Sequence, residues 1–288
     1  MMVEVLVHFV VPALVGVLIG IASGLLGIGG GTVMVPIFRL AFGMSATMST
    51  ATSLFAIIPT SISGAISHVK GKTCIPALGI AAGLGGACMS PIGVWLAQLS
   101  PDWLVMLAAA LIIGYSAINM FKKAFKIPQA GQPATGVDAA AAASRTSLGD
   151  AAASTPTADD SSLSRKQLLQ GAAIGLVAGL ASGYVGVGGG FIMVPLMLSI
   201  IGIPMRKASG TSLIAVMILA IPGVIEQGII GNINYLAGIA IVIGTIPGAV
   251  IGARLVTKVP ERTLRLLFGC FLIVAAVMLV LNEVGIFG

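Results

Sequence analysis

Two glycine turns with the chemistry to bind an anion occur once in each half of the chain. Residues 22–36 read ASGLLGIGGGTVMVP and residues 181–195 read ASGYVGVGGGFIMVP; ten of the fifteen positions are identical, at a constant offset of 159 residues. Three consecutive glycines interrupt a helix and leave backbone N–H groups open to a ligand. The residues that follow would begin a new helix, whose unpaired N–H groups and positive dipole end face the turn. The alternative is that these glycines serve only close helix packing.

Hydroxyl side chains extend this predicted site. The tripeptide TSL follows each turn at the same offset, at residues 52–54 and 211–213. A hydroxyl in a membrane helix can instead bond to the carbonyl four residues earlier. Its recurrence in both copies favours hydrogen bonding to a small oxyanion. The predicted substrate-binding residues are Gly29, Gly30, Gly31, Thr32, Thr52, Ser53, Gly188, Gly189, Gly190, Phe191, Thr211 and Ser212.

Four further residues are candidates for ion coupling or for the transport pathway, and each has two interpretations. Glu226, followed by Gln227, is either a proton carrier inside the membrane or a solvated loop residue. Arg254 is either an anchor at the inner side or an anion contact. Arg39 either extends to the membrane interface or lines the pathway.

The sequence lacks the motifs of common enzymes. It contains no HExxH, GxSxG or Walker A pattern, and the glycine turn departs from GxGxxG because the sixth position is Thr32 or Phe191. Its three cysteines stand singly, without metal-ligand spacing. We therefore expect no catalytic residues, no metal, no cofactor and no primary pumping by this chain alone.

The composition is that of a multi-pass membrane protein. Of the 288 residues, 57% are hydrophobic and 8% are charged, with a mean hydropathy of +1.10. The apolar runs have helical length and lack the alternation of a membrane β-barrel. The predicted fold is all-α and integral to the membrane.

Each half of the sequence divides into five hydrophobic elements. They cover residues 5–28, 32–42, 46–67, 74–99 and 103–121, then 168–187, 191–201, 207–225, 233–256 and 264–281. The second element of each half has about a dozen residues, or about 18 Å of helix, which is too short to cross a hydrocarbon core of about 30 Å. We expect about eight full spans and two short discontinuous segments.

The charges predict three regions and their orientation. Residues 1–125 form the first transmembrane repeat, 126–164 a flexible cytoplasmic linker rich in Ala, Ser, Thr, Gly and Pro, and 165–288 the second repeat. Lysines and arginines flank the linker, which the positive-inside rule places in the cytoplasm. Counting spans from there puts both termini outside and makes the second repeat inverted. Paired interrupted segments in inverted halves are typical of binding sites in secondary transporters.

Two G-[IV]-G-G-G-x-x-M-V-P segments, the TSL after each, and GARL at residues 252–255 resemble the TauE/SafE family of sulfite and organosulfonate exporters. The resemblance implies a multi-pass protein of the cell inner membrane that exports a small sulfur oxyanion by alternating access. Proton coupling and a homodimer are further hypotheses. The expected partners are a small anion and the lipid bilayer, with no nucleic acid. The alternatives are a passive anion channel and a non-transporting scaffold or assembly factor.

Overall fold

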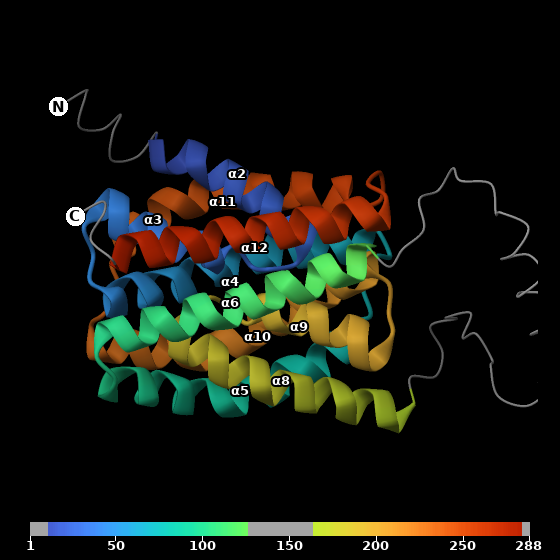
Figure 1. The fold of residues 1–288 in the computed structure, drawn as a ribbon, viewed down its shortest axis with the longest axis horizontal. Coiled ribbons are helices and arrows are strands. Elements are labelled where there is room, and N and C mark those ends of the chain that lie inside the picture. The colour runs from blue at the N-terminus through green and yellow to red at the C-terminus, as the bar shows by residue number, and fades with distance from the viewer. Residues whose placement is uncertain (1–10, 126–163, 284–288) are drawn as a thin grey trace, which may run out of the picture.

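The computed structural model describes residues 11–125 and 164–283, and over this part of the chain every regular element is helical (Figure 1). The first half contains α2 (Val11–Leu26), α3 (Gly31–Phe42), α4 (Ala46–Lys70), α5 (Pro76–Leu99) and α6 (Asp102–Phe125). The second contains α8 (Arg165–Val185), α9 (Gly190–Leu196) with its π-helical continuation η2 (Met197–Ile201), α10 (Met205–Ile230), α11 (Tyr235–Leu255) and α12 (Glu261–Glu283). The predicted linker lies outside the described residues, apart from Ser164.

The lengths of the helices agree with a multi-pass membrane protein. Seven described helices are long and apolar enough to cross a membrane, and the shorter apolar helices include Gly31–Phe42 and Gly190–Ile201. The all-helical class and the short second element of each half are therefore confirmed. The first predicted span, residues 5–28, is described from residue 11 onward as α2.

Each half packs its first helix against the fourth helix of the other half. Helix α2 lies along α11, and α8 lies along α5. Glycines make this approach possible: a Cβ placed on Gly20 would lie 2.4 Å from the carbonyl oxygen of Thr245, and one on Gly179 would lie 2.1 Å from that of Gly86. Thr245 and Gly86 are themselves 159 residues apart, so the two interfaces use equivalent positions. Small residues let membrane helices pack backbone to backbone.

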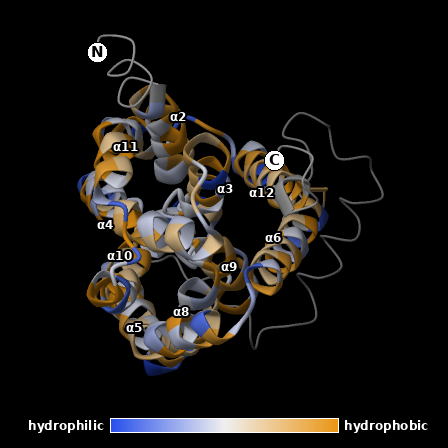
Figure 2. Ribbon diagram, turned by 90° about the vertical axis from the view of Figure 1, so that its left-hand side faces the viewer, coloured by the Kyte–Doolittle hydropathy of each residue, from blue (hydrophilic) through white to orange (hydrophobic). Residues whose placement is uncertain are grey.

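The remaining helices complete a bundle around the short ones. Seen from the end (Figure 2), the α2–α11 pair and the α5–α8 pair are separated by α4 and α10, while α6 and α12 lie together at one side. Helices α4 and α10 contact each other, and α3 packs on α4 as α9 packs on α10. The third helices thus connect the two halves through the middle of the bundle.

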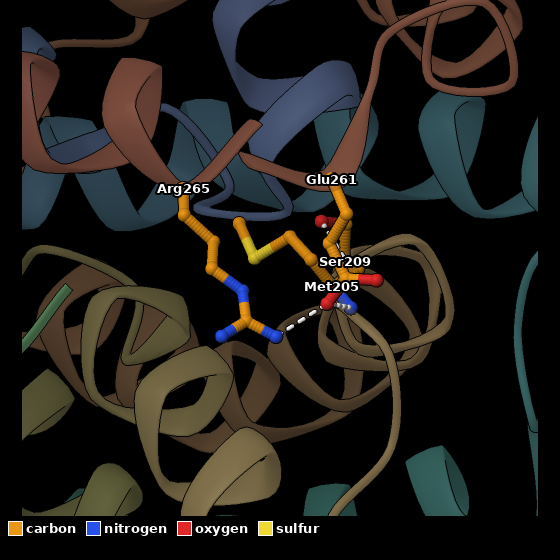
Figure 3. Close-up of polar contacts among 4 residues, drawn as sticks. All are labelled: Met205, Ser209, Glu261 and Arg265. Carbon is orange, nitrogen blue, oxygen red and sulfur yellow. Dashed lines mark hydrogen bonds and ion pairs between the residues drawn. The ribbon is translucent and has the colours of Figure 1, made fainter. Parts of the chain in front are cut away.

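An acidic residue at the start of the last helix in each half caps the third helix. Asp102 accepts a hydrogen bond from the Ala46 N–H at 3.3 Å, and Glu261 accepts one from the Met205 N–H at 3.4 Å. Figure 3 shows the second junction, where Arg265 also pairs with Glu261. A carboxylate beside the N-terminal N–H groups stabilises a helix. These contacts fix α6 and α12 relative to α4 and α10.

Candidate functional site

The two glycine turns meet in the interior of the protein. A Cβ placed on Gly31 would lie 2.7 Å from the carbonyl oxygen of Val187, and one on Gly190 would lie 2.5 Å from that of Gly27. Each turn therefore touches the backbone of the other. The two turns, 159 residues apart in the sequence, are therefore in direct contact.

This meeting point lies midway along the two helices that join the halves. Gly29 and Gly188 both face the side chains of Ile57 and Val216, which are fully buried. Ile57 is near the middle of α4, and Val216 is near the middle of α10. The turns are therefore far from both ends of the bundle.

The turns adopt a backbone conformation that requires glycine. Gly29 and Gly30 have φ values of 80° and 87°, and Gly188 and Gly189 have φ values of 86° and 68°. An L side chain is strained in this left-handed region. Successive left-handed residues turn the chain sharply before α3 and α9 begin.

Several backbone donors in the turns have no acceptor among the described residues. In the first turn these are the N–H groups of Gly29, Gly30, Gly31 and Thr32, and in the second those of Gly188, Gly189 and Phe191. The N–H of Gly190 donates instead to the carbonyl of Gly188 at 2.8 Å. All of these residues are buried. Because buried backbone donors are nearly always paired in proteins, two clusters of unpaired N–H groups indicate a place for an external acceptor.

Two serines that the sequence analysis did not single out lie beside these donors. Ser23 of α2 lies next to Gly30, and Ser182 of α8 lies next to Gly189, with 3.6 Å and 3.4 Å between each serine Cβ and a Cβ placed on the glycine. Both hydroxyls are fully buried and have no partner. The signal was available, because both serines stand in the repeated segment at the common offset of 159.

Two more unpartnered hydroxyls make the first turn more polar than the second. The hydroxyl of Thr32 is buried without a partner, and so is that of Ser61 in α4, whose Oγ lies 3.4 Å from a Cβ placed on Gly29. The equivalent positions in the second half are Phe191 and Ala220. The site therefore combines a repeated part, made of N–H groups and Ser23 and Ser182, with hydroxyls supplied by one half alone.

Each of the predicted TSL serines bonds to the glycine turn of the other half. Ser53 Oγ donates to the Gly186 carbonyl at 2.9 Å, and Ser212 Oγ donates to the Gly27 carbonyl at 2.7 Å. Gly27 and Gly186 begin the two turns and are equivalent positions. These two serine hydroxyls therefore stabilise the glycine turns.

The TSL threonines also bond to the opposite half. Thr52 accepts a hydrogen bond from the Asn234 N–H at 3.0 Å, and Thr211 accepts one from the Ile75 N–H at 2.9 Å. Thr211 also donates to the Lys207 carbonyl. The structure thus gives all four TSL hydroxyls a supporting role, and their contact with a substrate stays a prediction.

We expect Ser53→Ala and Ser212→Ala each to lower the free energy of unfolding by about 1–3 kcal/mol. Each change leaves a buried carbonyl at the start of a turn without its donor. The melting temperature of purified protein in detergent measures the loss. Ser67→Ala is the matched control, since its hydroxyl only bonds within α4. Melting temperatures equal to that of the control would contradict this support of the turns.

The coupling candidates of the second half lie away from the turns. Glu226 is ten residues past Val216 on α10, or about 15 Å of helix, near the end of the bundle. The side chain of Gln227 accepts a hydrogen bond from Asn232 Nδ2 at 2.8 Å and so helps to end α10. One Glu226 carboxylate oxygen is buried without a hydrogen-bond partner.

Neither candidate arginine is among the nearest neighbours of a Cβ placed on a turn glycine. Arg39 is in the last turn of α3, eight residues after Gly31, or about 12 Å of helix. Arg254 is exposed in the last turn of α11 and lines a groove with Lys70. No group of three potential metal ligands occurs within residues 11–125 and 164–283. A ligand at the turns would therefore meet N–H dipoles and hydroxyls rather than these charged side chains.

The comparisons with known proteins decide the family. The family model described as sulfite exporter TauE/SafE matches residues 12–279, which is nearly the whole chain. The chain belongs to the TauE/SafE family. As a member of this family of membrane transporters, with seven helices among the described residues that are long and apolar enough to span a bilayer, it is a multi-pass membrane protein.

Curated TauE/SafE relatives match along most of their length. The chain is 27% identical to a probable membrane transporter protein, YunE, of Bacillus subtilis, over 97% of this chain and 99% of the relative. It is 28% identical to a probable membrane transporter protein of Haemophilus influenzae, over 93% and 97%. A probable membrane transporter protein, YdhB, of Bacillus subtilis is 26% identical over 88% and 92%. No solved structure matches the chain.

Proposed function

We propose that this protein is a secondary transporter of the inner membrane that exports a small sulfur oxyanion, such as sulfite or an organosulfonate, by alternating access. The observation that carries this proposal is the pair of buried glycine turns, which meet midway along α4 and α10 with unpaired N–H groups. The family adds the substrate class.

The chemistry of the turns suits a reversible anion site. An oxyanion offers several strong acceptors, and the turns offer backbone N–H groups together with the hydroxyls of Ser23 and Ser182. Hydrogen bonds to a charged group contribute about 1.5–3 kcal/mol each, which is enough to select an anion over a neutral molecule. Neither Arg39 nor Arg254 is among the nearest neighbours of the turn glycines, so N–H dipoles and hydroxyls rather than a full positive charge face the anion. The bound anion can therefore leave when the site opens.

Alternating access also fits the arrangement of the halves. In Figure 1, α2 begins and α12 ends at one end of the bundle, while α6 ends and α8 begins at the other. We infer from these directions, and from the basic loops, that the repeats are inverted and that the termini face outward. In this conformation the turns are buried, and no turn residue lines either of the two grooves described below. We infer from this burial that the site is closed to both sides and opens by movement of helices.

Flux measurements in proteoliposomes test this function. We expect saturable uptake of labelled sulfite or of an organosulfonate by the purified protein, and no uptake by empty vesicles. Flux that fails to saturate at millimolar substrate, with single-channel current, would favour the passive channel. An absence of flux for every sulfur oxyanion and carboxylate in a panel, without any shift in melting temperature, would favour the scaffold.

Proton coupling through Glu226 is a separate part of the proposal. Its carboxylate has a buried oxygen without a hydrogen-bond partner near the C-terminal end of α10. Buried carboxylates in membrane helices often carry protons. We expect Glu226→Gln to change the pH dependence of flux. A profile identical to that of the unaltered protein would remove Glu226 from the mechanism.

A further inference from the structure

A groove with a volume of about 530 Å³, lined by both polar and apolar residues, opens between the last two turns of α4 and α11. These helices are neighbours at the lateral surface of the bundle, on the side across from α6 and α12 (Figure 2). The lining residues recur at helical spacing on one face of each helix. They include Ser63, Ser67 and Lys70 of α4, Val250 and Arg254 of α11, and Thr257, which follows α11.

The groove is positively charged. Lys70 and Arg254 are both exposed, and each lies in the last turn of its helix. No aspartate or glutamate is among the residues that line the groove. Two cations that face the same opening can hold one phosphate group between them.

A second, apolar groove adjoins the first on the other side of α4. It has a volume of about 350 Å³, runs between α4 and α10, and shares Ile66 and Lys70 with the α4–α11 groove. Ile62, Ile66 and Val69 of α4 are 39%, 50% and 49% exposed along it. A soluble anion gains nothing from contact with an apolar surface, whereas the acyl chain of a lipid packs favourably against it.

The equivalent helix pair at the opposite end of the bundle lacks these basic residues. Helices α10 and α5 pack there as α4 and α11 do, since each pair joins a third helix to the fourth helix of the other half. At the offset of 159, Ser67 corresponds to Glu226, Lys70 to Ile229 and Arg254 to Trp95. The fold repeats the helix pair, but only one copy is basic. The charge is therefore specific to one end and is not a consequence of the packing.

We propose that the α4–α11 groove binds the phosphate of an anionic phospholipid between Lys70 and Arg254, with an acyl chain along the α4–α10 groove. Basic pockets between membrane helices at the cytoplasmic side recognise such headgroups. This site is separate from the glycine turns. It places a lipid against α4, the helix that carries Ile57 and Ser61 beside the turns.

Native mass spectrometry of the purified protein with defined lipids tests this site. We expect phosphatidylglycerol to remain bound at least about tenfold more tightly than phosphatidylcholine, because two basic side chains face the headgroup. The double variant Lys70→Gln, Arg254→Gln should lose this preference. Lys258→Gln is the matched control, since Lys258 is exposed at the same end and does not line the groove. Arg254→Lys keeps the charge and should keep the preference.

Competition separates a lipid from a soluble anion. Sulfite and inorganic phosphate at millimolar concentration should leave bound phosphatidylglycerol in place. Equal retention of both lipids by the unaltered protein, displacement of the lipid by sulfite, or an unchanged preference in the double variant would each overturn the proposal. Flux of sulfite plays no part in these readouts, so the site can fail while the transport function stands.

Discussion

Replacing Ser23 and Ser182 together with alanine should reduce sulfur oxyanion flux by at least about tenfold without loss of folding stability. Each serine hydroxyl is fully buried, unpartnered and adjacent to a turn glycine. A hydrogen bond to an anion contributes about 1.5–3 kcal/mol, and about 1.4 kcal/mol corresponds to a factor of ten. Removing an unpaired buried hydroxyl costs the folded state nothing, so the melting temperature should stay constant or rise.

The contrast between flux and stability makes this prediction specific. Ser90→Ala is the matched control, because the Ser90 hydroxyl is also buried and unpartnered but lies beside Gly223 of α10. It should leave flux unchanged. If the double variant transports as fast as the control, the serines are not part of the anion site. If its melting temperature falls instead, their role is structural.

The second large effect concerns the helix pairs that hold the halves together. We expect Gly175→Leu to destabilise the protein by more than about 3 kcal/mol or to prevent folding. A Cβ placed on Gly175 would lie 1.9 Å from the carbonyl oxygen of Ala82, and backbone cannot move aside as a side chain can. Helices α8 and α5 would have to separate along their whole contact. The yield of folded protein and its melting temperature measure the effect.

Gly114 provides a matched control for Gly175→Leu. Gly114 lies within α6 and has no atom within 4 Å of a placed Cβ. Gly114→Leu should therefore keep the melting temperature or raise it, since leucine favours a helix over glycine by about 1 kcal/mol. Equal melting temperatures for the two variants would show that close backbone contact between α8 and α5 is not required.

Much of this structure could be predicted from the repeat alone. The constant offset of 159 residues identified the turns and the short elements after them, because glycine runs and helix length have direct local consequences. The location of the turns in the interior of the bundle is harder to predict from the sequence, since it depends on α3 and α9 being too short to span the membrane. Ser23 and Ser182 were missed because a serine on a small-residue face also suits simple helix packing.

Long-range partners could not be predicted from local patterns. The TSL hydroxyls recur in both halves, yet nothing near them in the sequence indicates that Ser53 bonds to Gly186 or Ser212 to Gly27. The same holds for His68 of α4, whose Nε2 lies 2.8 Å from the Gly24 carbonyl oxygen of α2. Such contacts depend on which helix faces pair, and several faces in this chain carry small residues.

The most direct test of the central claim is a structure determined with selenite in place of sulfite, with the selenium located by its anomalous scattering. The account predicts a selenite whose oxygens accept hydrogen bonds from the Gly30 or Gly189 N–H groups, with selenium beside Ser23 or Ser182. Selenium found only near Arg254, or bound without contact to either turn, would contradict it.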